Sequence, residues 1–208
     1  MLPKNDLEVR QRLHPFVHLT NKTVNTGTLN ETELIKRCKK ADPKAQEWIY
    51  GQHANAFFRM VMRYVKNRED AEDVLITAFT KIFNRIDSFS YQGDGSLQGW
   101  MKKIVINEAL MWLRRRHSFA LVDSVNELTE EESLETLSTM DAEDIYQMIT
   151  QLPTGYRTVF NLYVVEGYAH QEIAATLSIT ESTSRTQLFK AKALLKKMLT
   201  QEGFGYGT

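Results

Sequence analysis

Residues 167–197 read GYAHQEIAATLSITESTSRTQLFKAKALLKK, and this stretch decides how the C-terminal part of the chain folds. Apolar residues at helical spacing predict a short amphipathic helix over 170–177. A tight turn follows at 178–179, and a longer helix then begins with Thr180 as its N-cap. Two helices joined by a turn of three or four residues predict a helix-turn-helix.

The second helix of such a motif lies in the major groove of DNA. Arginine can bind guanine and glutamine can bind adenine, while hydroxyl groups and lysines can bind phosphates. An ordinary helical hairpin with a solvated, charged face is the alternative interpretation of the same pattern. The outward, candidate DNA-binding residues near the start of this helix are Ser182, Thr183, Arg185, Thr186, Gln187 and Lys190.

The N-terminal half also shows helical periodicity. Apolar residues at helical spacing predict helices over 44–64, 71–86 and 100–116, and Asp70 is placed to cap the second. Residues 88–99 contain three glycines and are predicted to form a loop. No useful stretch alternates as a strand would. The sequence therefore predicts an all-α fold with two small helical domains.

Charge is unevenly distributed along the 208 residues, although 26 basic and 26 acidic residues give a net charge of zero. Residues 118–151 contain nine acidic residues and no lysine or arginine, and both flanking blocks are basic. We expect a mobile arm over 1–28, a first domain over 29–117, an acidic linker over 118–140, a second domain over 141–200 and a tail over 201–208. Such asymmetry indicates partners better than the net charge does.

Several classes of protein are excluded. No apolar run approaches the roughly 20 residues of a membrane span, and charges interrupt the N-terminus where a signal peptide would be apolar. The single cysteine, Cys38, fits a reducing compartment, so we expect a cytoplasmic protein without membrane insertion. No nucleotide-binding motif or metal-ligand spacing is present, which predicts no cofactor and no enzymatic activity.

Two sets of residues, in sequence order, resemble the bacterial RNA polymerase sigma factors. Region 2 of that family is similar to Arg63-Tyr64, Ala71 to Val74, Phe79, Ile82-Phe83, Phe89, Gly99-Trp100, Ile104, Asn107 and Leu113 to Arg115. Region 4 is similar to Leu152-Pro153, Tyr156 to Phe160, Glu166-Gly167, Glu172 to Ala174, Leu177 to Ile179 and the helix from Ser184 to Leu195. Because no region 3 domain intervenes, the arrangement resembles the extracytoplasmic-function (ECF) group.

This resemblance implies a factor that binds core RNA polymerase, directs it to promoter DNA and helps to separate the strands. It assigns the helix-turn-helix to the upstream promoter element, and it implies an anti-sigma factor or other recruiting protein as a further partner. For the start-proximal element it implies contacts by Tyr91, Trp100, Lys102, Lys103, Asn107, Arg114 and Arg115. The alternative for Trp100, and for Phe89 at the start of the same loop, is a place in the core. For core polymerase it implies contacts by Asp73, Ile76, Thr77 and Lys81.

Some residues depart from the family pattern. Ile76 and Thr77 stand where a glutamine and an acidic residue are common, and Ile76 is either an exposed docking residue or a core residue. Ala169 replaces a capping serine, and Met111 replaces an acidic residue. The alternative function is a one-component helix-turn-helix regulator, which would bind DNA as a dimer without polymerase.

Overall fold

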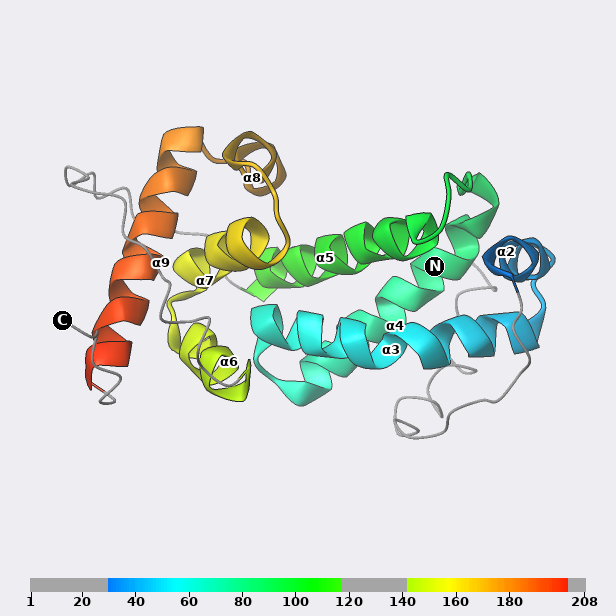
Figure 1. Ribbon diagram of the computed structural model, residues 1–208, viewed down its shortest axis with the longest axis horizontal. Helices are drawn as coiled ribbons and strands as arrows, with labels where there is room; N and C mark the ends of the chain where they lie inside the picture. The colour runs from blue at the N-terminus through cyan, green and yellow to red at the C-terminus, as the bar shows by residue number, and fades with distance from the viewer. Residues whose placement is uncertain (1–29, 117–141, 202–208) are drawn as a thin grey trace. The chain divides into compact units, whose positions relative to one another are not determined.

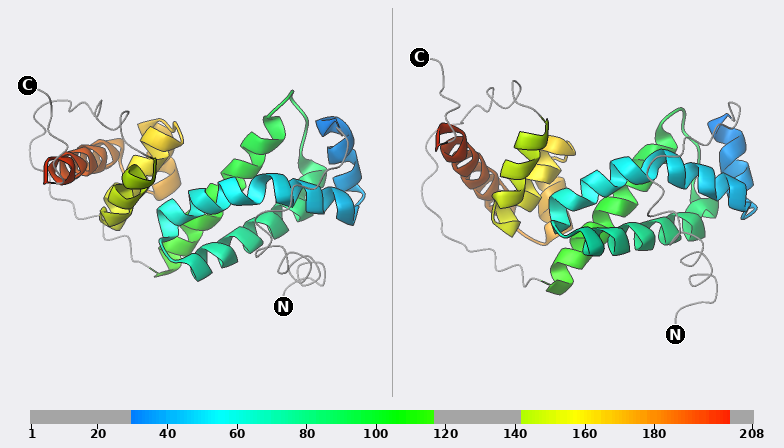
Figure 2. Two further views of the ribbon diagram at one scale, coloured as in Figure 1. Left: turned by 60° about the horizontal axis from the view of Figure 1, so that its bottom comes forward. Right: turned by 90° about the horizontal axis from the view of Figure 1, so that it is seen from below.

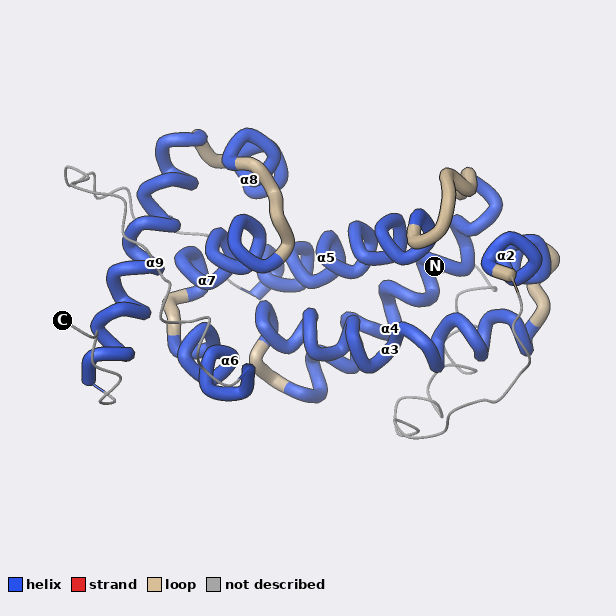
Figure 3. Tube along the Cα trace, viewed as in Figure 1, coloured by secondary structure: helices blue, strands red, loops and turns tan. Residues whose placement is uncertain are grey.

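The computed structural model describes residues 30–116 and 142–201, and the chain divides into two compact units between Arg116 and His117. All regular structure in the described ranges is helical, which confirms the all-α prediction (Figure 3). The expected arm at 1–28 and linker at 118–140 lie outside the described residues, as does the tail expected at 201–208 except for Gln201, which is the last residue of the final helix. None of the described helices is both long and apolar enough to cross a membrane.

The N-terminal unit contains three long helices that pack against one another (Figure 1). A short helix, α2, packs on α3 at the end of this bundle and contacts the 3₁₀ turn η2 (Figure 2). The elements are α2 (Glu31–Lys39), α3 (Pro43–Val65), α4 (Arg68–Arg85), η2 (Ile86–Ser88) and α5 (Ser96–Arg116).

Aromatic rings form the centre of this bundle. The fully buried ring of Phe79 lies 4.7 Å from Tyr50, 6.0 Å from Phe57 and 5.9 Å from Phe83, measured between ring centroids. Burial of each such side chain contributes about 1.5–3 kcal/mol. The spacing of these residues on α3 and α4 therefore fixes which faces of the two helices meet.

Side-chain caps mark where the helices of this unit begin. The amide oxygen of Asn30 accepts a hydrogen bond from Thr32 N at 3.0 Å, and Asp42 accepts one from Lys44 N at 2.9 Å. The prediction that Asp70 caps α4 is wrong. Asn67 is the N-cap, because its side chain accepts from the backbone N–H of Asp70 at 2.9 Å.

The helix predicted from residue 100 begins earlier, at Ser96. Leu97 is buried in the first turn, and the backbone N–H of Gly99 already donates to Gly95 O at 3.0 Å. Gly99 therefore lies inside the helix rather than in the preceding loop. The burial of Leu97 accounts for the difference, because packing of this kind is not visible in a glycine-rich sequence.

The C-terminal unit is built around its last helix. α6, α7 and α8 each contact α9, and α7 continues directly into one π-helical segment, η4. The expected helix over 170–177 is confirmed as α8, and Thr180 caps α9 as predicted, accepting from Thr183 N at 3.0 Å. The elements are α6 (Ala142–Gln151), α7 (Thr154–Phe160), η4 (Asn161–Val165), α8 (His170–Leu177) and α9 (Glu181–Gln201).

Candidate nucleic-acid and polymerase interfaces

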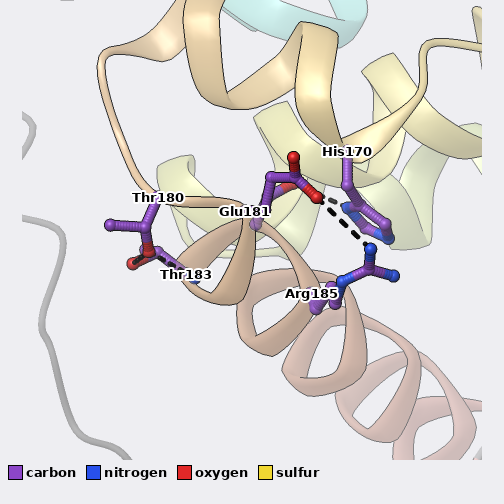
Figure 4. A network of polar contacts seen from close by, with 6 residues as sticks. His170, Thr180, Glu181, Thr183 and Arg185 are labelled. Carbon is purple, nitrogen blue, oxygen red and sulfur yellow. Dashed lines mark hydrogen bonds and ion pairs between the residues drawn. The ribbon is translucent and has the colours of Figure 1, made fainter.

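Contacts between α8 and α9 hold the start of the second helix of the motif in place (Figure 4). Nδ1 of His170, the first residue of α8, lies 2.8 Å from the buried hydroxyl oxygen of Ser184 on α9. The ring of Tyr163 stacks on His170 with 4.4 Å between centroids. These contacts fix the rotation of α9 about its axis, and so they decide which side chains point outward.

That rotation leaves five of the six predicted DNA-binding residues at least partly accessible and buries the sixth. Ser182 and Arg185 are exposed, and Thr183, Thr186 and Lys190 are half-buried. The expectation that Gln187 points outward is wrong, because its side chain is only 5% exposed. It lies against α7, where a Cβ added to Gly155 would be 3.1 Å from the Gln187 amide oxygen.

Arg185 is the most accessible charged group at this end of α9. Its guanidinium lies 3.4 Å from the carboxylate of Glu181, one turn earlier on the same exposed face (Figure 4). Exposed pairs of this kind contribute only about 0.3–0.5 kcal/mol. Arg185 can therefore exchange Glu181 for another acceptor, such as guanine or a phosphate, at little cost.

Burial lowers the pKa of His170, and the positive charges of Arg185 and Lys192 lower it further, while Glu181 raises it. The ring is consequently held in its neutral form. A neutral imidazole has one donor and one acceptor nitrogen, and either tautomer can pair Nδ1 with the Ser184 hydroxyl.

One face of α5 collects most of the residues predicted to contact the start-proximal element. Residues at intervals of three or four share a helix face, and such a stripe runs along α5. Lys103, Asn107 and Arg114 are exposed on it, Trp100 is half-buried at its start, and Met111 is exposed between them. Arg115 is exposed beside the stripe, whereas Lys102 is half-buried and lies off it.

The connection between α4 and α5 carries the exposed aromatic side chain of Tyr91. This ring is 40% exposed, and its hydroxyl donates to Asp94 Oδ1 at 2.6 Å. The hydrogen bond to Asp94 is the largest cause that raises the pKa of Tyr91, followed by desolvation and the negative charges of Asp94 and Glu31. Phe89 is buried instead and packs on the Trp100 ring with 5.2 Å between centroids.

The predicted polymerase-binding residues of α4 divide into two groups. Asp73 is exposed and Thr77 is half-buried, so both present part of their surface on the outer side of the helix. Ile76 is only 7% exposed, which makes it a core residue and contradicts an exposed docking role. Burial was the other of the two roles that the sequence leaves open.

Lys81 is half-buried and has a partner that sequence reasoning missed. Its ammonium lies 2.6 Å from Oε1 of Glu108 on α5, and Glu108 is almost fully buried. No local pattern connects these residues, because they lie on different helices. The pair joins the helix predicted to contact polymerase to the helix predicted to contact the start-proximal DNA.

Comparisons with known proteins identify both units. Residues 49–119 match the family model described as "Sigma-70 region 2", and residues 142–195 match "Sigma-70, region 4". Together the two matches span more than half of the chain.

Similar relatives include RNA polymerase sigma-H factor of Pseudomonas aeruginosa, which is 25% identical over an alignment of 182 residues that covers 81% of this chain and 93% of the relative. ECF RNA polymerase sigma-E factor of Escherichia coli is 28% identical over an alignment of 178 residues that covers 79% of this chain and 91% of the relative. A solved structure of the sigma factor RpoE with the anti-sigma factor NepR from Bartonella quintana is 18% identical. It covers 74% of this chain and 96% of that chain, with a TM-score of 0.48.

The two regions occur in the same order as in the resemblance drawn from the sequence. A one-component regulator does not account for the region 2 match, so the alternative function is not supported. The chain belongs to the sigma-70 family of RNA polymerase sigma factors and is of the ECF type.

Proposed function

We propose that this sigma factor uses three separate surfaces to bind core RNA polymerase, read the promoter and assist strand opening. Asp73, Thr77 and Lys81 on α4 contact core polymerase. The outer face of α5 and Tyr91 bind the start-proximal element as its strands separate. The start of α9 reads the upstream element as a duplex.

The exposed stripe on α5 is the observation that carries the start-proximal assignment. Trp100, Lys103, Asn107 and Arg114 share one face and combine an aromatic ring, an amide and two cations. Unpaired bases stack on aromatic rings with about 1–3 kcal/mol per base, and cations bind the phosphates beside them. Arg115 lies beside this face and supplies further positive charge, whereas Lys102 lies off it and is half-buried.

The start of α9 supplies the chemistry for duplex DNA. Arg185 and Ser182 are exposed, and Thr183, Thr186 and Lys190 lie around them, so guanidinium, hydroxyl and ammonium groups are present together. A good bidentate contact to a base edge is worth about 1–3 kcal/mol of discrimination. Gln187 takes no part, because its burial against α7 removes it from the DNA-facing side.

This function needs binding surfaces rather than catalytic groups, so we propose a factor without enzymatic activity that works in the cytoplasm, where RNA polymerase acts. An anti-sigma factor or another recruiting protein is a further proposed partner, as the Bartonella quintana sigma factor has one in its complex.

The test is transcription with purified components. The protein plus core polymerase should start transcripts at defined positions on a cognate promoter. Asn107→Ala and Lys103→Ala should reduce opening of the start-proximal element while binding to core polymerase stays normal. Lys36→Ala, at an exposed position of α2 outside the proposed surfaces, is the matched control. Specific promoter binding by the protein alone, as a dimer, would contradict the proposal.

A further inference from the structure

Helix α2 contacts both ends of the connection that carries Tyr91. At one end, the ammonium of Lys39 donates to the backbone oxygens of Asp87 at 3.2 Å and Phe89 at 2.9 Å. At the other end, Glu31 Oε2 accepts a hydrogen bond from the backbone N–H of Gly95 at 3.2 Å. Residues 31 and 39 are about 12 Å apart along a helix, so α2 spans the connection.

The connection has little regular structure of its own. Gly93 and Gly95 adopt positive φ values of 111° and 81°, a region that glycine enters without a steric penalty. Within the connection, Gln92 N donates to Ser96 Oγ at 3.2 Å, and Tyr91 bonds Asp94. These local bonds shape the turn and join it to the first residue of α5, and Phe89 at the other end of the connection packs on Trp100.

Helix α2 is a firm support for such a contact. Leu34, Ile35 and Cys38 are buried and hold one face of α2 in the core. Arg37 lies in the last turn of α2, and its guanidinium is 2.6 Å from the carboxylate of Asp42, which follows the helix and is the N-cap of α3. The positions of Lys39 and Glu31 are therefore set by the core and not by the connection that they contact.

We propose that Lys39 and Glu31 are positioning residues for strand opening, which hold the α4–α5 connection so that Tyr91 is presented to an unpaired base. This inference rests on the function proposed above for Tyr91. Neither residue contacts DNA in this scheme. Fixing the connection before DNA arrives lowers the entropy that must be lost when the base is captured.

The test uses the full chain in holoenzyme with variants matched on the same helix. Lys39→Met removes the two carbonyl contacts, and Lys36→Met removes a lysine from the same last turn without touching the connection. Glu31→Ala removes the Gly95 contact, and Glu33→Ala removes the other acidic residue of the first turn. Within each pair, the two substitutions remove the same charge from the same end of α2 and so have the same effect on the helix dipole. They differ only in whether a contact with the α4–α5 connection is lost. Lys39→Arg keeps a cationic donor and should restore function.

Two measurements are made on each variant. Hydrogen exchange of the amides at 87–96 should rise in Lys39→Met and Glu31→Ala and stay normal in Lys36→Met and Glu33→Ala. Holoenzyme affinity for a single-stranded start-proximal oligonucleotide should fall at least about fivefold in the first two variants, the effect of losing one net hydrogen bond. Affinity for the duplex upstream element and for core polymerase should not change.

The outcomes separate this inference from the function on which it rests. Unchanged hydrogen exchange at 87–96 in both Lys39→Met and Glu31→Ala would show that α2 does not hold the connection. Raised hydrogen exchange with a normal affinity for the single-stranded oligonucleotide would overturn the positioning role. Equal losses of core binding and upstream binding indicate general unfolding and also overturn it. If Tyr91→Ala has normal affinity while Lys39→Met and Glu31→Ala lose it, the positioning role stands and the assignment of Tyr91 as the base platform fails.

Discussion

Ile76 on α4 illustrates how a single residue can be assigned to the wrong surface. Its burial among the core residues of the N-terminal unit means that Ile76→Glu would place a carboxylate in an apolar site. We expect this substitution to lower the free energy of unfolding by roughly 3 kcal/mol. Urea denaturation followed by circular dichroism measures the loss. Asp73→Lys, on the exposed side of the same helix, should leave stability unchanged and weaken core binding.

The pair of Lys81 and Glu108 gives a second prediction for single residues. Lys81→Met leaves the nearly buried Glu108 carboxylate without its partner, and because Lys81 itself is half-buried we expect a loss of about 1–3 kcal/mol rather than that of a fully buried pair. Replacing both residues, as Lys81→Met with Glu108→Leu, should recover most of the lost stability. Denaturation of Lys81→Met, Glu108→Leu and the double variant gives the three free energies of unfolding that a double-mutant cycle needs. Additive losses in the double variant would show that the pair does not couple α4 to α5.

His170 makes the stability of the C-terminal unit depend on pH. Its pKa in the folded protein lies below the ordinary value of 6.5, so the unfolded chain takes up a proton more readily than the folded one. The contribution of the neutral His170 ring to the free energy of unfolding is therefore complete above pH 6.5. It is lost as the pH falls below that value. The thermal midpoint should be lower at pH 5.5 than at pH 7.5, and His170→Gln should reduce this difference. An unchanged difference would exclude His170 as its source.

At the scale of elements, the orientation of α9 predicts two different effects on promoter binding. Arg185→Ala should reduce the free energy of promoter binding by about 1–3 kcal/mol. It should also relax the base preference at one position of the upstream element. Lys190→Ala should weaken binding to all upstream sequences alike. It should also reduce the slope of log affinity against log salt concentration by about one. Holoenzyme affinities for a panel of upstream sequences at several salt concentrations distinguish the two. Uniform loss for Arg185→Ala would assign it to phosphate.

The elements themselves follow closely from local sequence, and their contacts do not. Helical spacing and capping residues are local, so the bounds of α8 and the N-cap Thr180 are predicted correctly. The burial of Gln187 depends on space left by Gly155 on another helix, and the contact between Lys81 and Glu108 joins residues 27 positions apart. Such contacts are set by tertiary packing, which helical periodicity does not report.

At the scale of the whole molecule, each of the two units buries its own apolar side chains. Between them, residues 118–140 are acidic and contain too few apolar residues to form a core of their own. Limited proteolysis of the free protein should therefore cut within 118–140 first and release two resistant fragments, identified by mass spectrometry. Earlier cleavage inside 45–115 would contradict this prediction.

The burial pattern of α9 sets how this factor can acquire a new target during evolution. Ser184, Gln187, Leu188 and Ala191 are buried and hold the helix, whereas Ser182 and Arg185 are exposed on its other side. Because the proposed promoter contacts lie at the exposed positions, we expect mutations there to change promoter preference with little effect on folding. We expect mutations at the buried positions to disturb the packing that sets the orientation of the whole helix. Under the proposed function, duplicated copies of the gene would diverge in regulon through a few surface codons while the buried residues of α9 stay the same.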